Sequence, residues 1–328
     1  MCLYFSMFSN IIQSQLNNKH IFTKTKCKQF NVMSVTIKDN VVTECDYPRN
    51  SPMIHRYAAF HKMVEDLVDN HTIQDITFNI NIADFPMRGM LNFCKHINHQ
   101  DQFVCPNHRF SINDISIEKD ETFTIHSDSN DLKDWDNCVD RMVSLYKKDD
   151  FDTKIPKVYA SFKYESSRKH YVDFVLNNRD ISSMYIYGGH PVHKWKALNN
   201  DKLVTYLMQE QLGGTKFKSF GEHSKYKYVM YLDGNALSDR MRLLLGMGSV
   251  IFRFPSKYEE FYTRELKPDI NYVLVNDYNE LRQKIEYYEQ HPELCKQIVE
   301  NNWNFLQNVL KRDNTLEYLA KLLNSITI

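Results

Sequence analysis

The sequence predicts an α/β fold of parallel strands and covering helices, and three patterns in the 328-residue chain indicate it. Residues 226–252 run from an apolar strand through a glycine-containing turn and a short amphipathic helix to a second strand, as in a βαβ unit. Residues 76–82 place apolar side chains at every second position, which is the period of a strand. Residues 293–310 and 315–326 have the apolar spacing of helices that pack on a core.

Residues 1–33 are expected to form a disordered leader ahead of the folded chain. Their mildly apolar start lacks the basic region and the small-residue cleavage site of a signal peptide, and Met33 could serve as a second start. The chain also ends without an ER-retention tetrapeptide. These features favour a cytoplasmic location.

The first candidate for chemistry is an acid that follows a strand. The spacing predicts a helix over 57–68 and a strand over 76–82 that ends at the turn 83–86. Asp84 in this turn stands at the carboxyl end of the strand, where α/β folds place their chemistry. The commoner use of an Asp near a proline is to bond its own backbone in the turn, so both interpretations stay open.

Residues 103–117 read as short strands or a binding loop, and the spacing then predicts a helix over 131–147. Within that helix, Asp134, Trp135 and Asp136 form a DxD pattern, which holds a divalent cation in some metal-dependent transferases. Because this DxD lies at a polar helix start and not after an apolar strand, we interpret it as a solvated helix N-terminus. No metal site is predicted.

A second block of strands and helices begins after a linker at 154–156. A strand is expected over 157–162, and the chain turns into a helix at 166–167 with Arg168 beside the cap. Free N–H groups at a helix start, together with an arginine, favour an anion. This turn is therefore a second candidate anion site, on the same side as the βαβ unit if the sheet is doubly wound.

The βαβ unit itself contains the main candidate anion site. Its turn includes Gly234, and Ser238 and Asp239 stand where the N-cap of a helix over 241–245 is expected. A helix N-terminus offers free N–H groups and the positive end of a dipole to an anion. Arg240 can add a bidentate contact to a phosphate. The pattern indicates a site for a nucleotide diphosphate.

The chain after the βαβ unit is expected to be mostly helical. Residues 257–266 read as a short helix or lid with Glu259 and Glu260 at its centre, followed by a strand over 271–275. A capping box at 277–280 then opens a further helix.

Composition excludes several classes of function. The chain has 41 basic and 41 acidic residues, and a net charge of zero argues against nucleic-acid binding as the main function. Its seven cysteines include no CxxC pair, which argues against a disulfide scaffold or a zinc module. Cys94 and Cys105 could pair in an oxidising compartment, but free thiols fit as well. No apolar segment has the length of a membrane span.

The residue order in roughly 70–310, and most strongly in its last third, resembles glycosyltransferase family 90, which includes eukaryotic protein O-glucosyltransferases and fungal capsular xylosyltransferases. Residues 81–86 resemble the family's N-x-x-D-[YW]-P segment. The matching residues of the βαβ unit are Lys227, Tyr228, Gly234, Ala236, Ser238, Arg240, Leu244, Gly248, Ser249 and Val250. Those that follow are Glu260, Phe261, Leu266, Lys267, Pro268, Tyr272 and Val275. So many matches in order are more specific than a single glycine motif.

The resemblance implies a GT-B fold, in which two Rossmann-like domains face a central cleft and C-terminal helices pack back. The acceptor-side domain would comprise residues 34–153 and the nucleotide-sugar-binding domain residues 154–300. Residues 301–328 would form the helices that pack back on the N-terminal domain.

The resemblance also implies an inverting, metal-independent transfer of a sugar from a UDP-sugar to a hydroxyl of a protein side chain or glycan. Glucose is the first expectation for the sugar and xylose the second, with no cofactor besides the donor. Asp84 matches the family's catalytic base. The residues that match its nucleotide-diphosphate site are Gly234, Asn235, Ala236, Leu237, Ser238, Asp239 and Arg240.

One turn departs from the family pattern. Family members usually carry F-R-G-S-R-T at the first strand-to-helix turn of the donor domain, where this chain has residues 162–167. The glycine is lost and Lys163 replaces an arginine. Lys163, Ser167 and Arg168 are therefore the candidates for donor contact at this turn. Glu259 and Glu260 are candidates for a lid or a donor contact. The altered turn keeps an alternative open, namely a non-catalytic GT-B-like protein that uses the nucleotide cleft as a scaffold.

Overall fold

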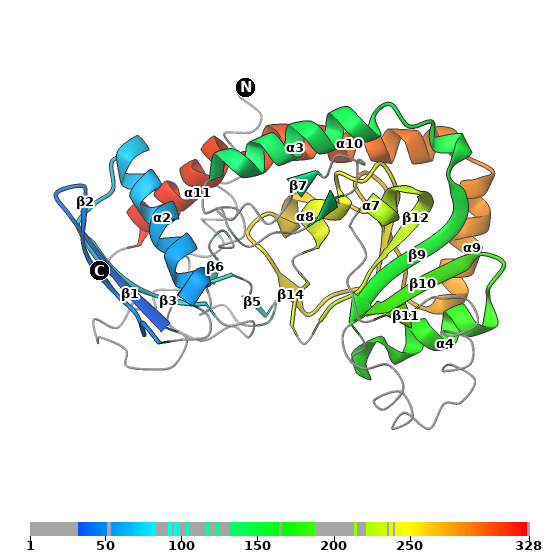
Figure 1. The fold of residues 1–328 in the computed structure, drawn as a ribbon, viewed down its shortest axis with the longest axis horizontal. Coiled ribbons are helices and arrows are strands. Elements are labelled where there is room, and N and C mark those ends of the chain that lie inside the picture. Colours follow the sequence, from blue (N-terminus) through cyan, green and yellow to red (C-terminus); the bar gives the residue numbers. More distant parts are fainter. Residues whose placement is uncertain are drawn as a thin grey trace.

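In the computed structural model, the chain folds into two α/β halves that lie side by side, with long helices running along both (Figure 1). The structure describes residues 32–50, 54–82, 91–93, 95–96, 98, 103–104, 106, 116–117, 123–124, 132–163, 166–187, 213–214, 221–234, 236–238 and 240–326. The predicted α/β fold class is confirmed, and so is the two-part GT-B arrangement with C-terminal helices that pack back.

The N-terminal half contains a five-stranded mixed sheet in the order β2-β1-β3-β4-β6. β1 runs antiparallel to β2 and β3, whereas β3, β4 and β6 are parallel. The strands are β1 (Val32–Lys38), β2 (Val41–Asp46), β3 (Ile76–Asn81), β4 (Leu91–Asn92) and β6 (Phe103–Val104). Helix α2 (Ile54–Asn70) extends the helix predicted over 57–68 and buries residues three and four apart: Tyr57, Phe60, Met63, Val64 and Leu67.

The first strand begins earlier than the sequence indicated. β1 starts at Val32, and both Val32 and Met33 are buried, so the predicted end of a leader at residue 33 falls inside this strand. Alternation explains the burial of Met33, which lies on the same core side of the strand as Val35 and Ile37. Asp39 and Asn40 form the two-residue turn to β2 with positive φ values of 50° and 59°, a conformation that Asp and Asn tolerate.

The C-terminal half is built on a six-stranded sheet in the order β11-β10-β9-β12-β13-β15, in which every strand pair is parallel. The strands are β9 (Ile155–Lys163), β10 (Ser182–Tyr187), β11 (Gly213–Gly214), β12 (Tyr226–Tyr231), β13 (Val250–Arg253) and β15 (Val273–Leu274). The βαβ unit predicted over 226–252 is therefore confirmed, with β12 and β13 adjacent and parallel. Near-continuous burial along these strands is typical of a sheet covered on both faces.

Helices cover the sheet and connect the two halves. They are α3 (Leu132–Tyr146), α4 (Lys169–Asn177), α7 (Gly221–Ser224), α8 (Met241–Leu244), α9 (Tyr278–Glu289), α10 (Pro292–Val309) and α11 (Arg312–Ser325). α9 begins at the predicted capping box, since the Asp277 side chain accepts from the Glu280 amide at 2.8 Å. Among the described residues, no helix combines the length and apolarity that crossing a bilayer requires.

The last two helices both contact α3, and α11 also reaches α2 of the N-terminal half. α11 packs against α2 and α3, and α3 lies along α10 (Figure 1). The Trp135 indole donates to the Leu310 carbonyl at 2.6 Å, between the ends of α10 and α11. The Asp136 carboxylate accepts from the Arg312 amide at 2.7 Å and so satisfies the start of α11. The DxD pattern thus lies in a helix, as predicted, and two of its residues anchor the C-terminal helices.

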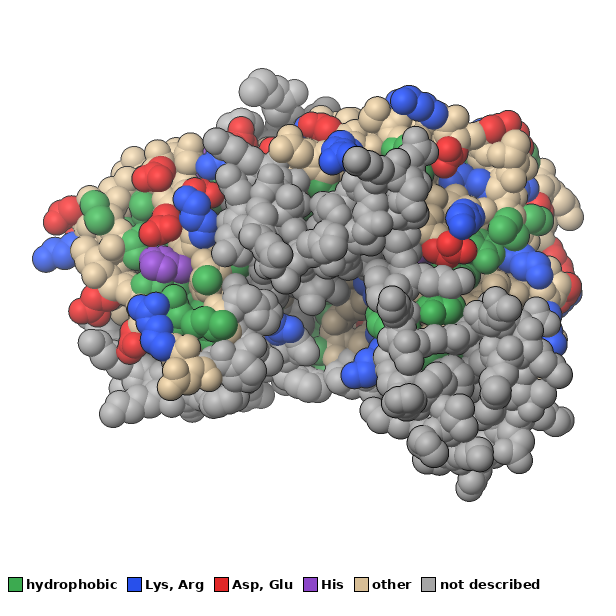
Figure 2. All heavy atoms as spheres, in the orientation of Figure 1, with side chains coloured by type: hydrophobic (Ala, Val, Ile, Leu, Met, Phe, Trp, Pro, Cys, Tyr) green, Lys and Arg blue, Asp and Glu red, His purple; other side chains and the backbone are tan. Residues whose placement is uncertain are grey.

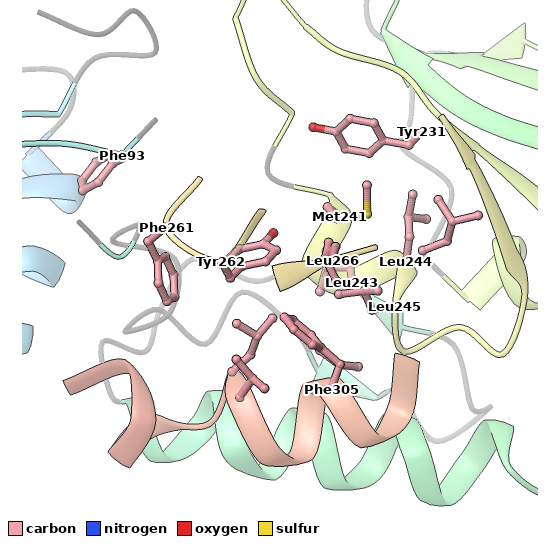
Figure 3. Packing of buried hydrophobic residues seen from close by; sticks show 14 of the residues in the cluster. Phe93, Tyr231, Met241, Leu243, Leu244, Leu245, Phe261, Tyr262, Leu266 and Phe305 are labelled. Carbon is pink, nitrogen blue, oxygen red and sulfur yellow. The ribbon is translucent and has the colours of Figure 1, made fainter. Parts of the chain in front are cut away.

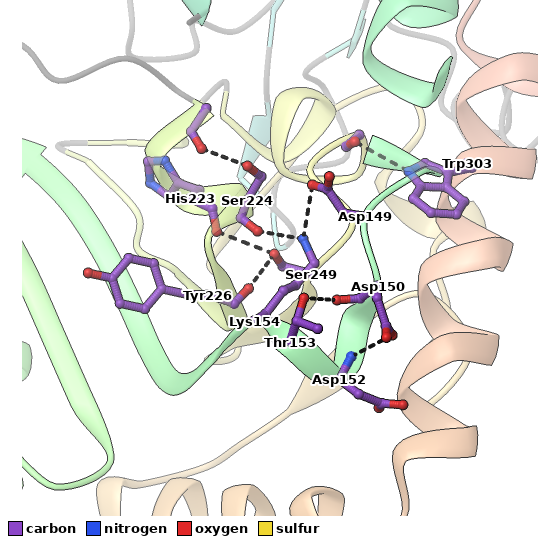
Figure 4. A network of polar contacts seen from close by, with 12 residues as sticks. Asp149, Asp150, Asp152, Thr153, Lys154, His223, Ser224, Tyr226, Ser249 and Trp303 are labelled. Atoms are coloured by element: carbon purple, nitrogen blue, oxygen red, sulfur yellow. Dashed lines mark hydrogen bonds and ion pairs between the residues drawn. The ribbon is translucent and has the colours of Figure 1, made fainter. Parts of the chain in front are cut away.

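The linker predicted at 154–156 is wrong. Ile155 and residue 156 already belong to β9, and Lys154 is buried with its ammonium donating to the Ser224 carbonyl. Around it, the Ser249 hydroxyl donates to the Tyr226 carbonyl at 2.7 Å (Figure 4). These bonds join the amino ends of β9, β12 and β13, so the connection between the halves is packed and not loose.

The helix or lid predicted over 257–266 is instead a strand and a tight turn. β14 (Tyr258–Glu259) pairs antiparallel with β5 (Lys95–His96) from the N-terminal half, and η4 (Thr263–Glu265) follows. Phe261 and Tyr262 beside this ladder join one apolar cluster with Phe93 of the N-terminal half and Phe305 of α10 (Figure 3). The remaining short elements are β7 (Ser116–Ile117), β8 (Phe123–Thr124), η2 (Phe151–Thr153) and η3 (Ser166–Arg168).

Candidate functional site

The strand order of the six-stranded sheet marks a place at its edge where a ligand can bind. From β9 the chain moves outward to β10 and β11, and it then returns to the other side of β9 with β12, β13 and β15. In open α/β sheets, ligands bind in the crevice outside the carboxyl ends of the strands at such a reversal. The loops after β9 and β12 therefore define the candidate site.

Arg168 connects the ends of these two strands. Its Nε donates to the Asp233 carbonyl at 3.0 Å, and its Nη1 donates to the Lys163 carbonyl at 2.9 Å. Lys163 ends β9 and Asp233 follows β12, so one guanidinium group holds both loops. Arg168 is 7% exposed and its Cζ lies 5.8 Å from the centre of the Phe162 ring. The predicted strand-to-helix turn is present, with Arg168 at the N-cap position of α4.

Arg240 reaches the same edge from the loop before α8. Its Nη1 donates to the Ser161 carbonyl of β9, and its Nη2 lies 2.5 Å from the Tyr187 hydroxyl at the end of β10. Its Cζ also lies 5.8 Å from the centre of the Tyr187 ring. Sequence reasoning gave Arg240 a phosphate-binding role, and the structure brings it together with Arg168 at the carboxyl edge of the sheet.

The helix start expected to bind the anion differs from the prediction. α8 covers only Met241–Leu244, its N-cap position is Arg240, and no side chain caps it. Ser238 is buried, and its amide donates to the Tyr231 hydroxyl, which in turn donates to the Ser238 carbonyl at 2.7 Å. The predicted capping role of Ser238 is therefore wrong, because Tyr231 occupies its backbone groups. With so short a helix, the two arginines and not a helix dipole supply the positive charge.

The loop between β12 and α8 brings backbone close to Arg168. A Cβ atom on Gly234 would lie 3.5 Å from Nη2 of Arg168, so a side chain here would cover part of that guanidinium group. Ala236 is buried and Leu237 is half-buried. Asn235 and Asp239, which the family pattern also assigns to this site, lie outside the described residues.

Asp233 is an acid at the site that the sequence interpretation did not single out. Burial raises the pKa of its carboxyl, while a hydrogen bond from Ser256 and the nearby charges of Arg253 and Arg168 oppose that rise. Arg253, the last residue of β13, is also buried beside Tyr231 and was not singled out from the sequence. A charged residue at or just after the end of an apolar strand is the sequence signal that could have identified Asp233 and Arg253.

The two glutamates proposed for a lid or donor contact are held by local partners. Both carboxylate oxygens of Glu259 accept from Arg264, at 2.8 and 2.9 Å. Glu260 accepts from the Tyr262 hydroxyl at 2.6 Å. Both glutamates are buried next to the ladder that connects the two halves. Their observed contacts stabilise this bridging segment.

In the other half, the described stretch that contains β3 ends just before Asp84, the base that the family resemblance implies. Asp84 itself lies outside the described residues, but it follows β3 by three positions. The carboxyl end of β3 is fixed, since Arg56 donates to the Ile82 carbonyl at 2.9 Å and Asn81 donates to the Asn92 side chain at 3.0 Å. Cys94 and Cys105, for which a pairing and free thiols both stayed open, lie outside the described residues. Cys45, Cys138 and Cys295 carry free thiols.

The chemistry of the site is that of an anion binder. Arg168 and Arg240 use carbonyl and hydroxyl oxygens to fix their orientation. A guanidinium group presents its N–H donors in a fixed, planar fork. Lys163 and Ser167 are exposed beside Arg168. On the described part of the face in Figure 2, basic and acidic side chains are interspersed. Preoriented guanidinium groups suit the oxygens of a phosphate or diphosphate.

The chain is similar in sequence to known proteins. A family model described as Glycosyl transferase family 90 matches residues 16–327. Protein O-glucosyltransferase 2 of Danio rerio is 33% identical over 108 residues, which cover 33% of this chain and 22% of the relative. Protein O-glucosyltransferase 1 of Homo sapiens is 29% identical over 104 residues, which cover 31% and 26%. Uncharacterized protein 179R of Invertebrate iridescent virus 6 is 30% identical over 145 residues, which cover 40% and 12%.

The matched part thus spans between 12% and 26% of these relatives' own lengths. Among solved structures, Anabaena HepE in complex with UDP-glucose has a TM-score of 0.40 and 11% identity, covering 57% of this chain and 53% of that chain. WaaG, a glycosyltransferase involved in lipopolysaccharide biosynthesis, has a TM-score of 0.36 and 10% identity, covering 56% and 50%.

Proposed function

The chain belongs to glycosyl transferase family 90, and from this premise we propose that it transfers a sugar from a UDP-sugar to a hydroxyl group of a protein side chain or glycan. Glucose is the proposed sugar and xylose the runner-up. The proposed reaction inverts the configuration at the transferred carbon and requires no metal ion.

The observation that carries the proposal is the pair of guanidinium groups at the reversal of the strand order. Arg168 and Arg240 are each anchored to β9, the central strand of this reversal, and Arg168 also holds the loop after β12. Transfer of a sugar from a nucleotide donor leaves a diphosphate whose negative charge grows as the bond breaks. Donors oriented in advance toward that charge stabilise the transition state without further reorganisation.

Inversion requires the acceptor hydroxyl to attack from the side opposite the leaving diphosphate. The base that takes its proton must therefore come from the other half of the molecule. Asp84 is the proposed base, and the strand that precedes it, β3, belongs to the N-terminal sheet, whereas the arginine pair belongs to the C-terminal sheet. A base and a leaving-group site in opposite halves are the arrangement that an inverting transfer needs.

The names of the relatives support the choice of sugar and acceptor. Two of the three relatives described above are named as protein O-glucosyltransferases, which favours glucose as the sugar and a protein hydroxyl as the acceptor. The loss of the family's glycine and arginine near Lys163 leaves the contacts to the sugar ring as the part most open to change.

A donor screen tests the proposal. The purified chain is mixed with UDP-glucose, UDP-xylose and other UDP-sugars, and UDP release is followed with and without candidate acceptor peptides. We expect UDP release with UDP-glucose, accelerated by an acceptor, and a rise in melting temperature when UDP is added. A ligand at a hundredfold its Kd stabilises the folded chain by about 2.7 kcal/mol. If no UDP-sugar and no UDP binds, the proposed function is wrong.

The second candidate is a non-catalytic protein that retains the nucleotide cleft as a scaffold. The altered turn at residues 162–167 favours it, because Lys163 stands where family members usually carry an arginine. The same screen separates the two functions. UDP binding with no release of UDP from any donor, even with acceptors present, would support the scaffold.

A further inference from the structure

Arg253 is a buried arginine at the same edge of the sheet as Arg168 and Arg240. It is the last residue of β13, and it pairs in register with Tyr231, the last residue of β12. Adjacent positions on parallel strands point to the same face, so Arg253 and Tyr231 lie side by side. Cζ of Arg253 lies 5.4 Å from the centre of the Tyr231 ring and 5.1 Å from the centre of the Tyr272 ring.

This side chain differs from the two other arginines in its hydrogen bonds. Arg253 is 6% exposed, and its Nε is buried without a hydrogen-bond partner. Within the part of the chain that the structure describes, no hydrogen bond or ion pair involves its guanidinium group; its contacts are the two tyrosine rings. Arg168 and Arg240, in contrast, each donate to two oxygens of the protein.

A buried charge without hydrogen bonds is costly, because water no longer solvates it. The rings on either side provide some compensation through cation–π attraction, but they offer no acceptor in the plane of the guanidinium group. Asp233 contributes a nearby negative charge, but burial raises the pKa of its carboxyl. This carboxylate is itself poorly solvated, so it compensates the buried charge of Arg253 only in part. The N–H donors of Arg253 therefore remain available to an acceptor that the protein itself does not supply.

The place of Arg253 in the sheet indicates which kind of ligand could accept its hydrogen bonds. β13 is the neighbour of β12, and β12 carries the loop that Arg168 holds beside Gly234. A ligand whose anionic group extends from Arg168 across the end of β12 would meet Arg253 next. A single phosphate offers oxygens within one group, whereas a diphosphate spans two, and this favours a nucleoside diphosphate as the ligand.

We propose that Arg253 is a third donor-binding residue, which contacts a phosphate oxygen of the nucleoside diphosphate and is paired only when that ligand is bound. The inference rests on the proposed function, because it assumes that the site takes a nucleotide-sugar. It assigns different roles to the three arginines: Arg168 and Arg240 are oriented by the protein before binding, and Arg253 by the ligand.

The test compares Arg253→Gln and Arg253→Lys with the unaltered chain, with UDP, uridine and inorganic pyrophosphate as probes in calorimetric titrations. Arg282→Gln serves as the matched control, since Arg282 is an exposed arginine on α9 paired with Asp180 at 2.9 Å. We expect Arg253→Gln to weaken UDP binding at least tenfold and to leave uridine binding unchanged. Arg253→Lys, which keeps the charge, should recover part of the loss. Arg282→Gln should bind UDP normally.

The probes distinguish a failure of the role proposed for Arg253 from a failure of the proposed function. If the unaltered chain binds no UDP, the proposed function fails. If it binds UDP and Arg253→Gln binds UDP equally well, only the role of Arg253 fails. An equal loss for UDP and uridine would also overturn that role, because it would indicate a structural effect and not a phosphate contact. The uridine measurement keeps the test decisive even if Arg253→Gln lowers the stability of the fold.

Discussion

The Arg240 guanidinium group and the Tyr187 hydroxyl are in contact at the carboxyl edge of the C-terminal sheet, with 2.5 Å between Nη2 and the hydroxyl oxygen. Tyr187 ends β10, while Arg240 comes from the loop before α8 on the far side of β9. The contact therefore spans the point where the strand order reverses. It fixes one of the two arginines on which the proposed donor site depends.

Breaking this contact should weaken the binding of UDP without abolishing it. Tyr187→Phe removes one anchor of Arg240 but leaves its bond to the Ser161 carbonyl. A typical hydrogen bond contributes about 1 kcal/mol, so we expect UDP to bind roughly fivefold more weakly. Arg240→Gln removes the cation itself and should cost at least tenfold. Titration calorimetry on both variants measures the two losses of UDP affinity. A larger loss of affinity for Tyr187→Phe than for Arg240→Gln would contradict this prediction.

Arg168 should matter both for binding and for stability. Arg168→Gln removes the bonds to the Asp233 and Lys163 carbonyls, which leaves two partly buried acceptors without this donor at the ends of β12 and β9. We expect the free energy of unfolding to fall by about 2 kcal/mol and UDP affinity to fall at least tenfold. Urea unfolding and calorimetry measure the two effects. Unchanged affinity in a folded variant would exclude Arg168 from the donor site.

Asp84→Asn separates binding from chemistry. The substitution keeps the size of the side chain but removes its ability to accept the proton of the acceptor hydroxyl. We expect UDP to bind with normal affinity while sugar transfer falls by about two orders of magnitude or more. The rate is measured as acceptor-dependent UDP release. Transfer at the normal rate in this variant would mean that another residue is the base.

Lys154 predicts a specific dependence of stability on pH. Burial lowers the pKa of its ammonium group to about 8, whereas in the unfolded chain this pKa has its ordinary value of 10.5. Below pH 8 the group is charged in both states, so the cost of burying the charge is fully present. Between pH 8 and 10.5 the folded state has lost the proton and the unfolded state still binds it, so stability rises with pH in this window.

The comparison that isolates this effect is Lys154→Met against the unaltered chain, because other titrating groups cancel in the difference. The stability of the unaltered chain relative to the variant should rise by about 3 kcal/mol from pH 7.5 to pH 10.5. Urea unfolding at several pH values measures it. A difference that stays constant across this range would mean that the Lys154 pKa is not lowered on folding.

Trp135 should be a main determinant of how firmly the C-terminal helices are held. Its indole donates to the Leu310 carbonyl at 2.6 Å, and the Arg242 guanidinium group lies 4.5 Å from its ring. Trp135→Phe loses the hydrogen bond and part of the packing, and we expect about 2 kcal/mol less stability. Leu294→Ala on α10 is the control, since Leu294 is 39% exposed and its loss should have a small effect. Equal effects of the two variants would contradict this role.

Local patterns predicted those parts of the structure that depend on neighbouring residues in the chain. The βαβ unit, the alternating strand that became β3 and the capping box of α9 each follow from side-chain spacing within a few residues. The arginines near the two turns, Arg168 and Arg240, could be identified for the same reason, because turns after strands of a parallel sheet converge at one edge.

Features decided by distant residues could not be predicted in this way. Ser238 has the side chain of a helix cap, but the Tyr231 hydroxyl binds both of its backbone groups. Residues 257–266 look helical, yet β14 pairs with β5, which lies far away in the sequence. The burial of Lys154 depends on Ser224, and the isolation of Arg253 is a property of its surroundings. None of these partners has a fixed spacing that a sequence pattern could reveal.

The central strands β9, β12 and β13 carry two different tasks at their two ends. At their amino ends, Lys154 and Ser249 bond to the chain near β12. At their carboxyl ends, the Ser161 carbonyl anchors Arg240 and the Asp233 carbonyl anchors Arg168, and β13 ends at Arg253. The length of a strand separates the two ends, so we expect mutations at one end to have little effect on the contacts at the other end. Such a division would let donor preference drift through exchanges in the carboxyl-end loops during evolution, while the amino-end bonds keep the scaffold intact.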